Sequence, residues 1–249
     1  MTLPEFLPGV PVDYVLQRFA LAGGNEVESG KLASPESSAA LAANCFAWFA
    51  HRPHLLPPFP GLEAAYPPLS VDIEYNARFP WSGGRHPWLD AMITTPAEVI
   101  GVESKRFEPF RGAKRASLSA AYDRPVWGDR MGSFEQLRDD LRSGHVVFKY
   151  LDATQLVKHA LGLLAEGRRT GKRPILVYLF AEPTELAGRT IPATALAAHR
   201  AEVQSFAERV ADSEVTFHSA SYSVWLSNWS GANMDAADHG RRLSTAFNL

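Results

Sequence analysis

Two carboxylates and a lysine lie at the ends of two neighbouring strands that the sequence predicts. The strands cover residues 88–94 and 98–105 and are joined by a short turn at residues 95–97. A turn centred near residue 96 or 97 places Asp90 nearly opposite Glu103, and Lys105 leaves the same face of the sheet as Glu103. Carboxylates this close repel each other unless a divalent cation bridges them, and a lysine beside them can stabilise an anion or help to activate water.

The same residues have a simpler interpretation, a solvated hairpin with an ordinary Glu/Lys pair. Two features of the context favour chemistry. The apolar run Val99–Val102 changes abruptly to Glu-Ser-Lys, and Trp88-Leu89 precedes Asp90 in the same way. Polar groups that follow buried strands in this manner are expected to gather at one end of the hairpin.

The elements that must position these side chains follow from periodicity and capping patterns. Ser34 and Pro35 predict the start of a helix over about 35–50, Asp152 and Gln155 form a capping box before a second helix, and prolines make residues 51–68 irregular. The remaining predicted elements are a helix at 11–22, a short helical stretch around 134–141, strands at 69–76, 175–180 and 215–225, and a helix at 193–211. From residue 35 onward the order is helix, three strands, helix, strand, helix, strand. This order predicts an α/β fold with a mixed sheet flanked by helices on both sides.

The arrangement resembles the PD-(D/E)xK nuclease superfamily, which has a restriction-endonuclease-like fold. The likeness covers roughly residues 34–225, and Asp90, Glu103 and Lys105 carry it; Trp88-Leu89 stand where the proline of the motif would directly precede Asp90. The resemblance implies an αβββαβ core plus a C-terminal helix and strand. It also implies that Asp90, Glu103 and the backbone carbonyl of Ser104 bind Mg²⁺ or Mn²⁺, and that Lys105 positions or activates the attacking water.

Accessory residues follow from the same resemblance. Gln155 and His159 lie four residues apart on the second predicted helix and match a polar pair that the family often carries, with a solvated helix face as the alternative. Glu36 matches a glutamate of the first helix, although the helix dipole explains an acid there equally well. Weaker accessory candidates are Glu26, Glu28, Asp72 and Glu74; Asp72 and Glu74 alternate with apolar residues of the strand and can simply face water.

A local excess of positive charge follows the second strand of the hairpin. Between Lys105 and Arg130 there are seven basic and three acidic residues, interleaved with four aromatic ones. Such a stretch can hold phosphates and stack on bases, and Lys158 adds a cation on the neighbouring helix. The phosphate-binding candidates within the stretch are Arg111, Lys114 and Arg115. The alternative is a charged loop that packs its aromatic residues inward.

Composition limits the number of domains and the location of the protein. The chain has 249 residues, 46% hydrophobic residues and a net charge of −2, so we expect one domain over 1–249, with an N-terminal extension at 1–33 and an irregular basic and aromatic insertion at 106–144. No segment predicts a membrane helix or a secretory signal, and the single Cys45 favours a reducing, cytoplasmic location.

Three functional hypotheses follow. The leading one is a Mg²⁺-dependent phosphodiesterase, a DNA endonuclease of defence or repair, with nucleic acid as its partner, no membrane partner, and a homodimer left open. The second is a nucleic-acid-binding module that has the nuclease fold and no turnover. The third is an unrelated α/β protein in which the E-x-K sequence is accidental.

Overall fold

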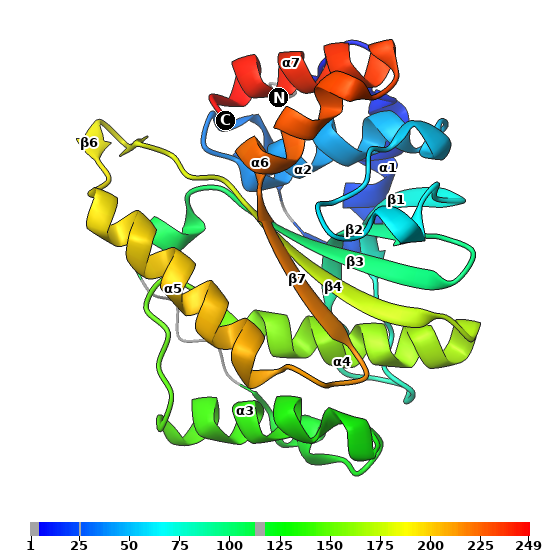
Figure 1. The fold of residues 1–249 in the computed structure, drawn as a ribbon, viewed down its shortest axis with the longest axis vertical. Helices are drawn as coiled ribbons and strands as arrows, with labels where there is room; N and C mark the ends of the chain where they lie inside the picture. Colours follow the sequence, from blue (N-terminus) through cyan, green and yellow to red (C-terminus); the bar gives the residue numbers. More distant parts are fainter. Residues whose placement is uncertain (1–4, 25, 113–117) are drawn as a thin grey trace.

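The computed structural model describes residues 5–24, 26–112 and 118–249, and its centre is a mixed five-stranded sheet (Figure 1). The strand order is β1-β2-β3-β4-β7, in which β1, β2 and β3 pair antiparallel while β3, β4 and β7 pair parallel. The strands are β1 (Ser70–Asn76), β2 (Trp88–Thr94), β3 (Glu98–Lys105), β4 (Arg173–Phe180) and β7 (Thr216–Ser221). A separate small ribbon consists of β5 (Glu185–Leu186) and β6 (Arg189–Thr190).

Helices cover both faces of the sheet, as Figure 1 shows. One layer contains α1 (Val12–Ala22), α2 (Ser38–Phe46), α6 (Tyr222–Ser227) and α7 (Met234–Phe247). The other layer contains α3 (Gly132–Ser143), α4 (Ala153–Thr170) and α5 (Ala193–Arg209). Each layer packs its own apolar cluster against the sheet, and the α/β class with helices on both faces is therefore confirmed.

The central elements lie where the sequence places them. The observed bounds of β2 and β3 match the predicted 88–94 and 98–105. Asp152 is the N-cap of α4, and its side chain accepts a hydrogen bond from the backbone N–H of Gln155. α1 ends at Gly23, whose φ of 68° is the left-handed conformation that glycine adopts at low cost.

Two predicted boundaries are wrong. The first helix of the core begins at Ser38 with Ser37 as its N-cap, because the Ser37 side chain accepts from the N–H of Ala40. The last strand ends at Ser221, whose side chain caps α6, so residues 222–225 are helical. Within 106–144, the short helix predicted around residues 134–141 is confirmed as α3, which is longer by two residues at each end.

The N-terminal region is part of the fold and covers the free edge of β1. The Arg18 guanidinium on α1 donates to the carbonyl oxygens of Ile73 (2.8 Å) and Glu74 (2.6 Å), and Tyr14 accepts from the N–H of Ile73. Val15 and Phe19 are buried in the adjoining core. Side chains of α1 thus satisfy backbone groups that an edge strand would otherwise offer to another chain.

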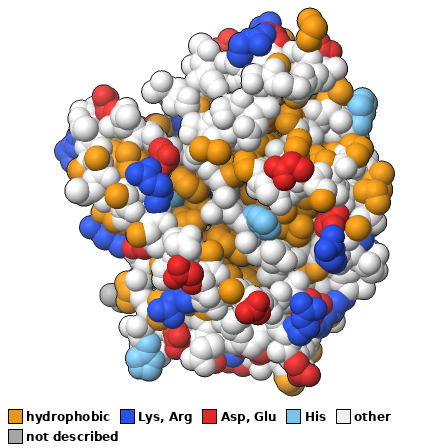
Figure 2. Space-filling view, viewed as in Figure 1, with side chains coloured by type: hydrophobic (Ala, Val, Ile, Leu, Met, Phe, Trp, Pro, Cys, Tyr) orange, Lys and Arg blue, Asp and Glu red, His pale blue; other side chains and the backbone are white. Residues whose placement is uncertain are grey.

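Charges of both signs are interspersed on the face in which α5 and β7 lie in front. Figure 2 shows apolar side chains across the middle of this face and no continuous block of basic residues. No helix of the described segments is long and apolar enough to cross a membrane.

Gly162 gives a first test of the packing between α4 and the sheet. A Cβ at this position would lie 2.7 Å from Pro87 Cγ and 3.0 Å from the backbone oxygen of Ala77. We expect Gly162→Ala to lower the free energy of unfolding by about 1–3 kcal/mol, because overpacking outweighs the gain in helix propensity. Gly132→Ala is the control, since open space surrounds Gly132 and α3 should gain up to about 1 kcal/mol. Equal effects in urea unfolding would contradict this account.

His239 gives a second test. Its ring is 2% exposed, stacks on Trp48 and shares a 3.0 Å hydrogen bond with the carbonyl of Asn44, and burial lowers its pKa to about 4. Between pH 6.5 and 4 the unfolded chain therefore binds a proton that the folded chain does not. As the pH is lowered through this range, His239 reduces the free energy of unfolding by up to about 3 kcal/mol. His239→Gln should flatten the dependence of unfolding free energy on pH in that window and leave the slope above pH 7 unchanged.

Candidate functional site

Asp90, Glu103 and Lys105 come together at the ends of β2 and β3. The paired register ends with Ala91 opposite Val102, and Asp90 and Glu103 are the next residues on the two strands. Glu103 and Lys105 are also close enough to act on the charge of Asp90. The carboxylate of Asp90 accepts a 2.6 Å hydrogen bond from the backbone N–H of Ser104. Burial raises the pKa of Asp90 well above its usual range, and the neighbouring Glu103 raises it further. The two carboxylates are therefore electrostatic neighbours.

Glu103 is the most enclosed of these groups. Its side chain is 2% exposed and forms an ion pair with the ammonium group of Lys105. On the other side, Nδ1 of His159 lies 3.0 Å from Oε2 of Glu103, close enough for an ion pair although the contact lacks hydrogen-bond geometry. Burial alone would raise the pKa of Glu103, but Lys105 and His159 lower it to about 2. Glu103 is a carboxylate at any ordinary pH.

Lys105 is held as a cation. Burial lowers its pKa, but the carboxylates of Glu103 and Asp90 outweigh burial, and the net shift is upward. A lysine in this state is a poor general base. It can supply positive charge and hydrogen-bond donors to an anion or to a water molecule, and its side chain remains 16% exposed for that purpose.

The polar residues of α4 lie in two kinds of position, one buried against Glu103 and the others half-buried. His159 is 3% exposed and faces Glu103, so the alternative of a solvated helix face does not hold for this residue. Gln155, one turn earlier, is half-buried and lines a pocket beside Lys105. Lys158 is half-buried, and burial lowers its pKa.

Glu74 belongs to this neighbourhood, although alternation along its strand suggested that it faces water. The β1–β2 register passes from Ile73–Ala91 to Tyr75–Leu89, which places Glu74 opposite Asp90. Its φ of 45° is unusual for a residue with a side chain, and Arg18 donates to its carbonyl oxygen. Burial raises the pKa of Glu74 to about 7, and Glu26 and Glu103 contribute.

A change in alternation accompanies this strained residue. Before Glu74, Val71 and Ile73 face the α2 layer, whereas Tyr75 packs in the α4 layer. Because side chains alternate with a period of two, one irregular residue reverses the faces of all that follow. No pattern in the sequence marks the reversal, and this is why Glu74 could not be placed in advance.

Ser104 links the site to the opposite layer. Its hydroxyl shares a 2.7 Å hydrogen bond with the hydroxyl of Tyr222 on α6, while its N–H donates to Asp90. The side chain therefore points away from Glu103 and Lys105. The carbonyl of Ser104 remains the expected ligand atom from this residue.

The donor set has the chemistry that a hard cation prefers. Asp90 and Glu103 offer carboxylate oxygens, and the buried Oε1 of Glu103 has no hydrogen-bond donor of good geometry. Within residues 5–24, 26–112 and 118–249, no three His, Cys, Asp or Glu side chains are arranged to hold a metal ion. Mg²⁺, however, usually keeps several waters and takes only one or two protein carboxylates. Asp90, Glu103 and the carbonyl of Ser104 are compatible with this coordination of Mg²⁺.

Glu36 lies apart from the carboxylates. It precedes α2 instead of lying in its first turn, and its carboxylate pairs with the guanidinium of Arg111 at 2.8 Å. Nearby, Arg106 is buried and donates to the carbonyl oxygens of Pro35 and Phe247. Arg106 thus joins chain segments, and Arg111 is the exposed cation here; Lys114 and Arg115 lie outside the described residues.

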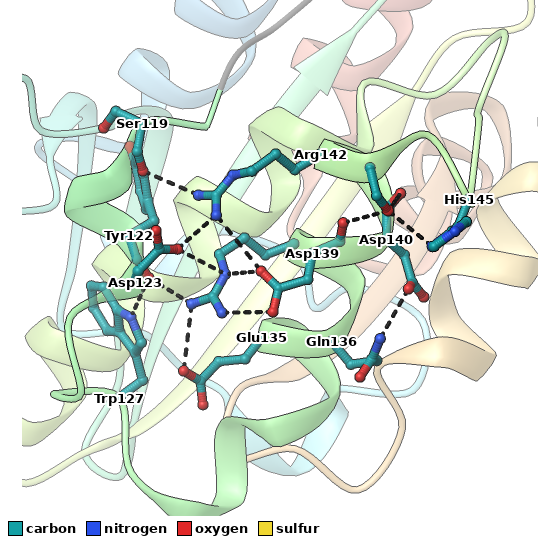
Figure 3. Close-up of polar contacts among 12 residues, drawn as sticks. Ser119, Tyr122, Asp123, Trp127, Glu135, Gln136, Asp139, Asp140, Arg142 and His145 are labelled. Atoms are coloured by element: carbon teal, nitrogen blue, oxygen red, sulfur yellow. Dashed lines mark hydrogen bonds and ion pairs between the residues drawn. The ribbon is translucent and has the colours of Figure 1, made fainter.

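The aromatic residues of the insertion pack inward. Phe107, Tyr122 and Trp127 are at most 8% exposed, which supports the alternative of a loop with an internal aromatic core. Figure 3 shows how α3 holds this loop: Arg142 pairs with Asp123 at 2.8 Å and donates to the carbonyl of Ser119. The acids on α3 and on the loop also neutralise part of its positive charge. These three rings are not available to stack on bases.

A pocket of about 430 Å³ opens beside Lys105 and is lined by Gln155, Tyr178 and residues 148–153. Glu202 on α5 fixes this wall, because its carboxylate accepts from three successive backbone N–H groups. The donors are Lys149 (2.8 Å), Tyr150 (2.7 Å) and Leu151 (2.9 Å). Nothing in the sequence pattern connects Glu202 with this distant loop.

The role of Glu202 can be tested. We expect Glu202→Gln to lower the free energy of unfolding by about 2 kcal/mol, because a neutral amide replaces a charged acceptor of three donors. The backbone amides of Lys149, Tyr150 and Leu151 should exchange with deuterium faster than in the parent chain. Glu208→Gln is the matched control on the same helix, where the carboxylate accepts a hydrogen bond from the Gln204 side chain. Unchanged exchange in the loop would refute the anchoring role.

Comparisons with protein-family models, with curated proteins and with solved structures returned no match. The likeness to the PD-(D/E)xK superfamily therefore rests on the order of the elements and on the residues at the ends of β2 and β3. The architecture stands on its own as an α/β fold with a mixed, helix-flanked sheet.

Proposed function

We propose that this chain is a divalent-metal-dependent phosphodiesterase that cleaves nucleic acid, with DNA as its substrate, in the manner of a defence or repair endonuclease. The observation that carries the proposal is the meeting of Asp90, Glu103 and Lys105 at adjacent strand ends, where a buried carboxylate lies beside a permanently charged lysine. The helix and strand order around them supports it.

Each side chain has a task in this proposal. Asp90, Glu103 and the carbonyl of Ser104 would hold the cation, and Glu74, on the neighbouring strand, would add a carboxylate through a water molecule. A bound Mg²⁺ would supply Lewis-acid activation of water and compensation for the charge of the phosphate. Lys105 would donate to the attacking water or to a phosphate oxygen, and His159 keeps the Glu103 carboxylate oriented.

A second candidate is a nucleic-acid-binding module without turnover. It is favoured by one observation: the Glu103 carboxylate is already engaged by Lys105 and His159. In this alternative Lys105 and His159 occupy the place of the metal, and the site is structural. The accidental E-x-K hypothesis is weakened because Glu103 is buried and ion-paired with Lys105, whereas the Glu/Lys pair of an ordinary hairpin is solvated.

The direct experiment is degradation of supercoiled, linear and single-stranded DNA side by side, with Mg²⁺, Mn²⁺ or EDTA. Metal-dependent cleavage of any of them supports the phosphodiesterase. Binding without cleavage under all conditions supports the second candidate.

Lys105→Ala separates catalysis from binding. We expect cleavage to fall by about 10²- to 10⁴-fold, because the lysine acts on water or phosphate in the reaction. The stabilisation of the fold by Mn²⁺, measured as a shift in melting temperature, should persist because the carboxylates remain.

Lys172→Ala is the matched control. The Lys172 ammonium binds the carbonyl oxygens of Thr95 and Pro96 at the other end of β3. This variant should cleave at the parent rate. Cleavage at the parent rate by Lys105→Ala would instead remove Lys105 from the reaction.

A further inference from the structure

Two adjoining pockets lie in a row that starts at Lys105. The first, of about 430 Å³, and the second, of about 680 Å³, share the wall formed by Pro109, Arg111 and Gly112 on one side and Lys149 and Tyr150 on the other. The second pocket ends at the β5–β6 ribbon, where it is lined by Arg189. We call this feature the Tyr150 groove.

Cations line the groove along its length. Lys105 lies at one end, Arg111 and Lys149 in the middle, and Arg189 at the other end. Two acids, Glu108 and Asp152, also line it, and two of the cations already have carboxylate partners, since Lys105 pairs with Glu103 and Arg111 with Glu36. Four lining cations against two lining acids still give a positive balance, which suits a chain of negative charges.

Tyr150 provides a flat apolar surface in the middle of the groove. It is half-buried, its ring centroid lies 6.1 Å from that of Phe110, and the Lys149 ammonium lies 4.9 Å from the ring centroid. The Glu202 carboxylate fixes the backbone of both residues. A ring that is held in place before binding loses little entropy when a planar group stacks on it.

We propose that the Tyr150 groove binds one unpaired nucleic-acid strand that leads to or from the phosphate at Lys105, with a base stacked on Tyr150. This inference rests on the proposed function and adds the substrate class. Pockets of this size admit ligands of a few hundred Å³. A DNA duplex is too wide to enter them, since its major groove alone is about 12 Å wide. Stacking on an aromatic ring tolerates any base, so the groove selects single strands without selecting sequence.

The test is the affinity of the intact chain for fluorescently labelled oligonucleotides in Ca²⁺, in which cleavage is not expected to interfere. The probes are a 15-nucleotide oligo-dT, an abasic strand of equal charge, and a duplex of equal length. We expect the oligo-dT to bind most tightly. Tyr150→Ala should weaken its binding by about 5- to 100-fold and make it equal to the abasic strand, because stacking is lost.

Three further variants refine the result. Tyr150→Phe keeps the ring and should bind the oligo-dT like the parent chain. Lys149→Ala should reduce the slope of log affinity against log salt by about 0.7, as expected for one phosphate contact on a single strand. Arg241→Ala on α7, in the opposite helix layer, should change nothing.

Failure of this inference differs from failure of the proposed function. Tighter binding of the duplex by the parent chain, or parent-like affinity of Tyr150→Ala, would overturn the groove while metal-dependent cleavage could still stand. Single-strand binding that depends on Tyr150, in a chain that cleaves nothing with Mg²⁺ or Mn²⁺, would retain the groove and remove the phosphodiesterase.

Discussion

A carboxylate that is 2% exposed at the end of a central strand must be compensated, and much of the site follows from how Glu103 meets this requirement. The effective cost of burying an ion is several kcal/mol, and removing one partner of a buried pair typically costs about 3–5 kcal/mol. Lys105 compensates Glu103 from the same strand, and His159 does so from α4. The charge of Glu103 thus ties the position of a helix to the end of a strand.

The position of β3 in the sheet explains why several groups converge there. β3 pairs antiparallel with β2 and parallel with β4, so it receives Asp90 from one neighbour and Tyr178, opposite Glu103, from the other. The strained Glu74 extends the acidic row by one more strand. Backbone strain of about 1–3 kcal/mol persists when its surroundings over-determine it, as the Arg18 hydrogen bonds do here.

The sequence predicts the hairpin and its three ionisable residues well because both depend on local information. Apolar alternation and the turn at 95–97 determine the register of β2 with β3, and this register brings Asp90 near Glu103. The start of α2 was misplaced because Ser34 and Ser37 are both good caps, and only packing selects Ser37. Glu74, Glu202 and the inward rings of Phe107 and Trp127 depend on segments distant in sequence, which periodicity does not connect.

Arg106 has a consequence for how the site is connected to the rest of the molecule. It follows Lys105 directly and is held by carbonyl oxygens from the segment before α2 and from the last turn of α7. α7 in turn contacts Trp229 at Gly240, where an added Cβ would lie 2.8 Å from the indole. Arg106 therefore ties the residue that follows Lys105 to the helical layer on the far side of the sheet, so the site and the chain's last helix share one hydrogen-bonded connection.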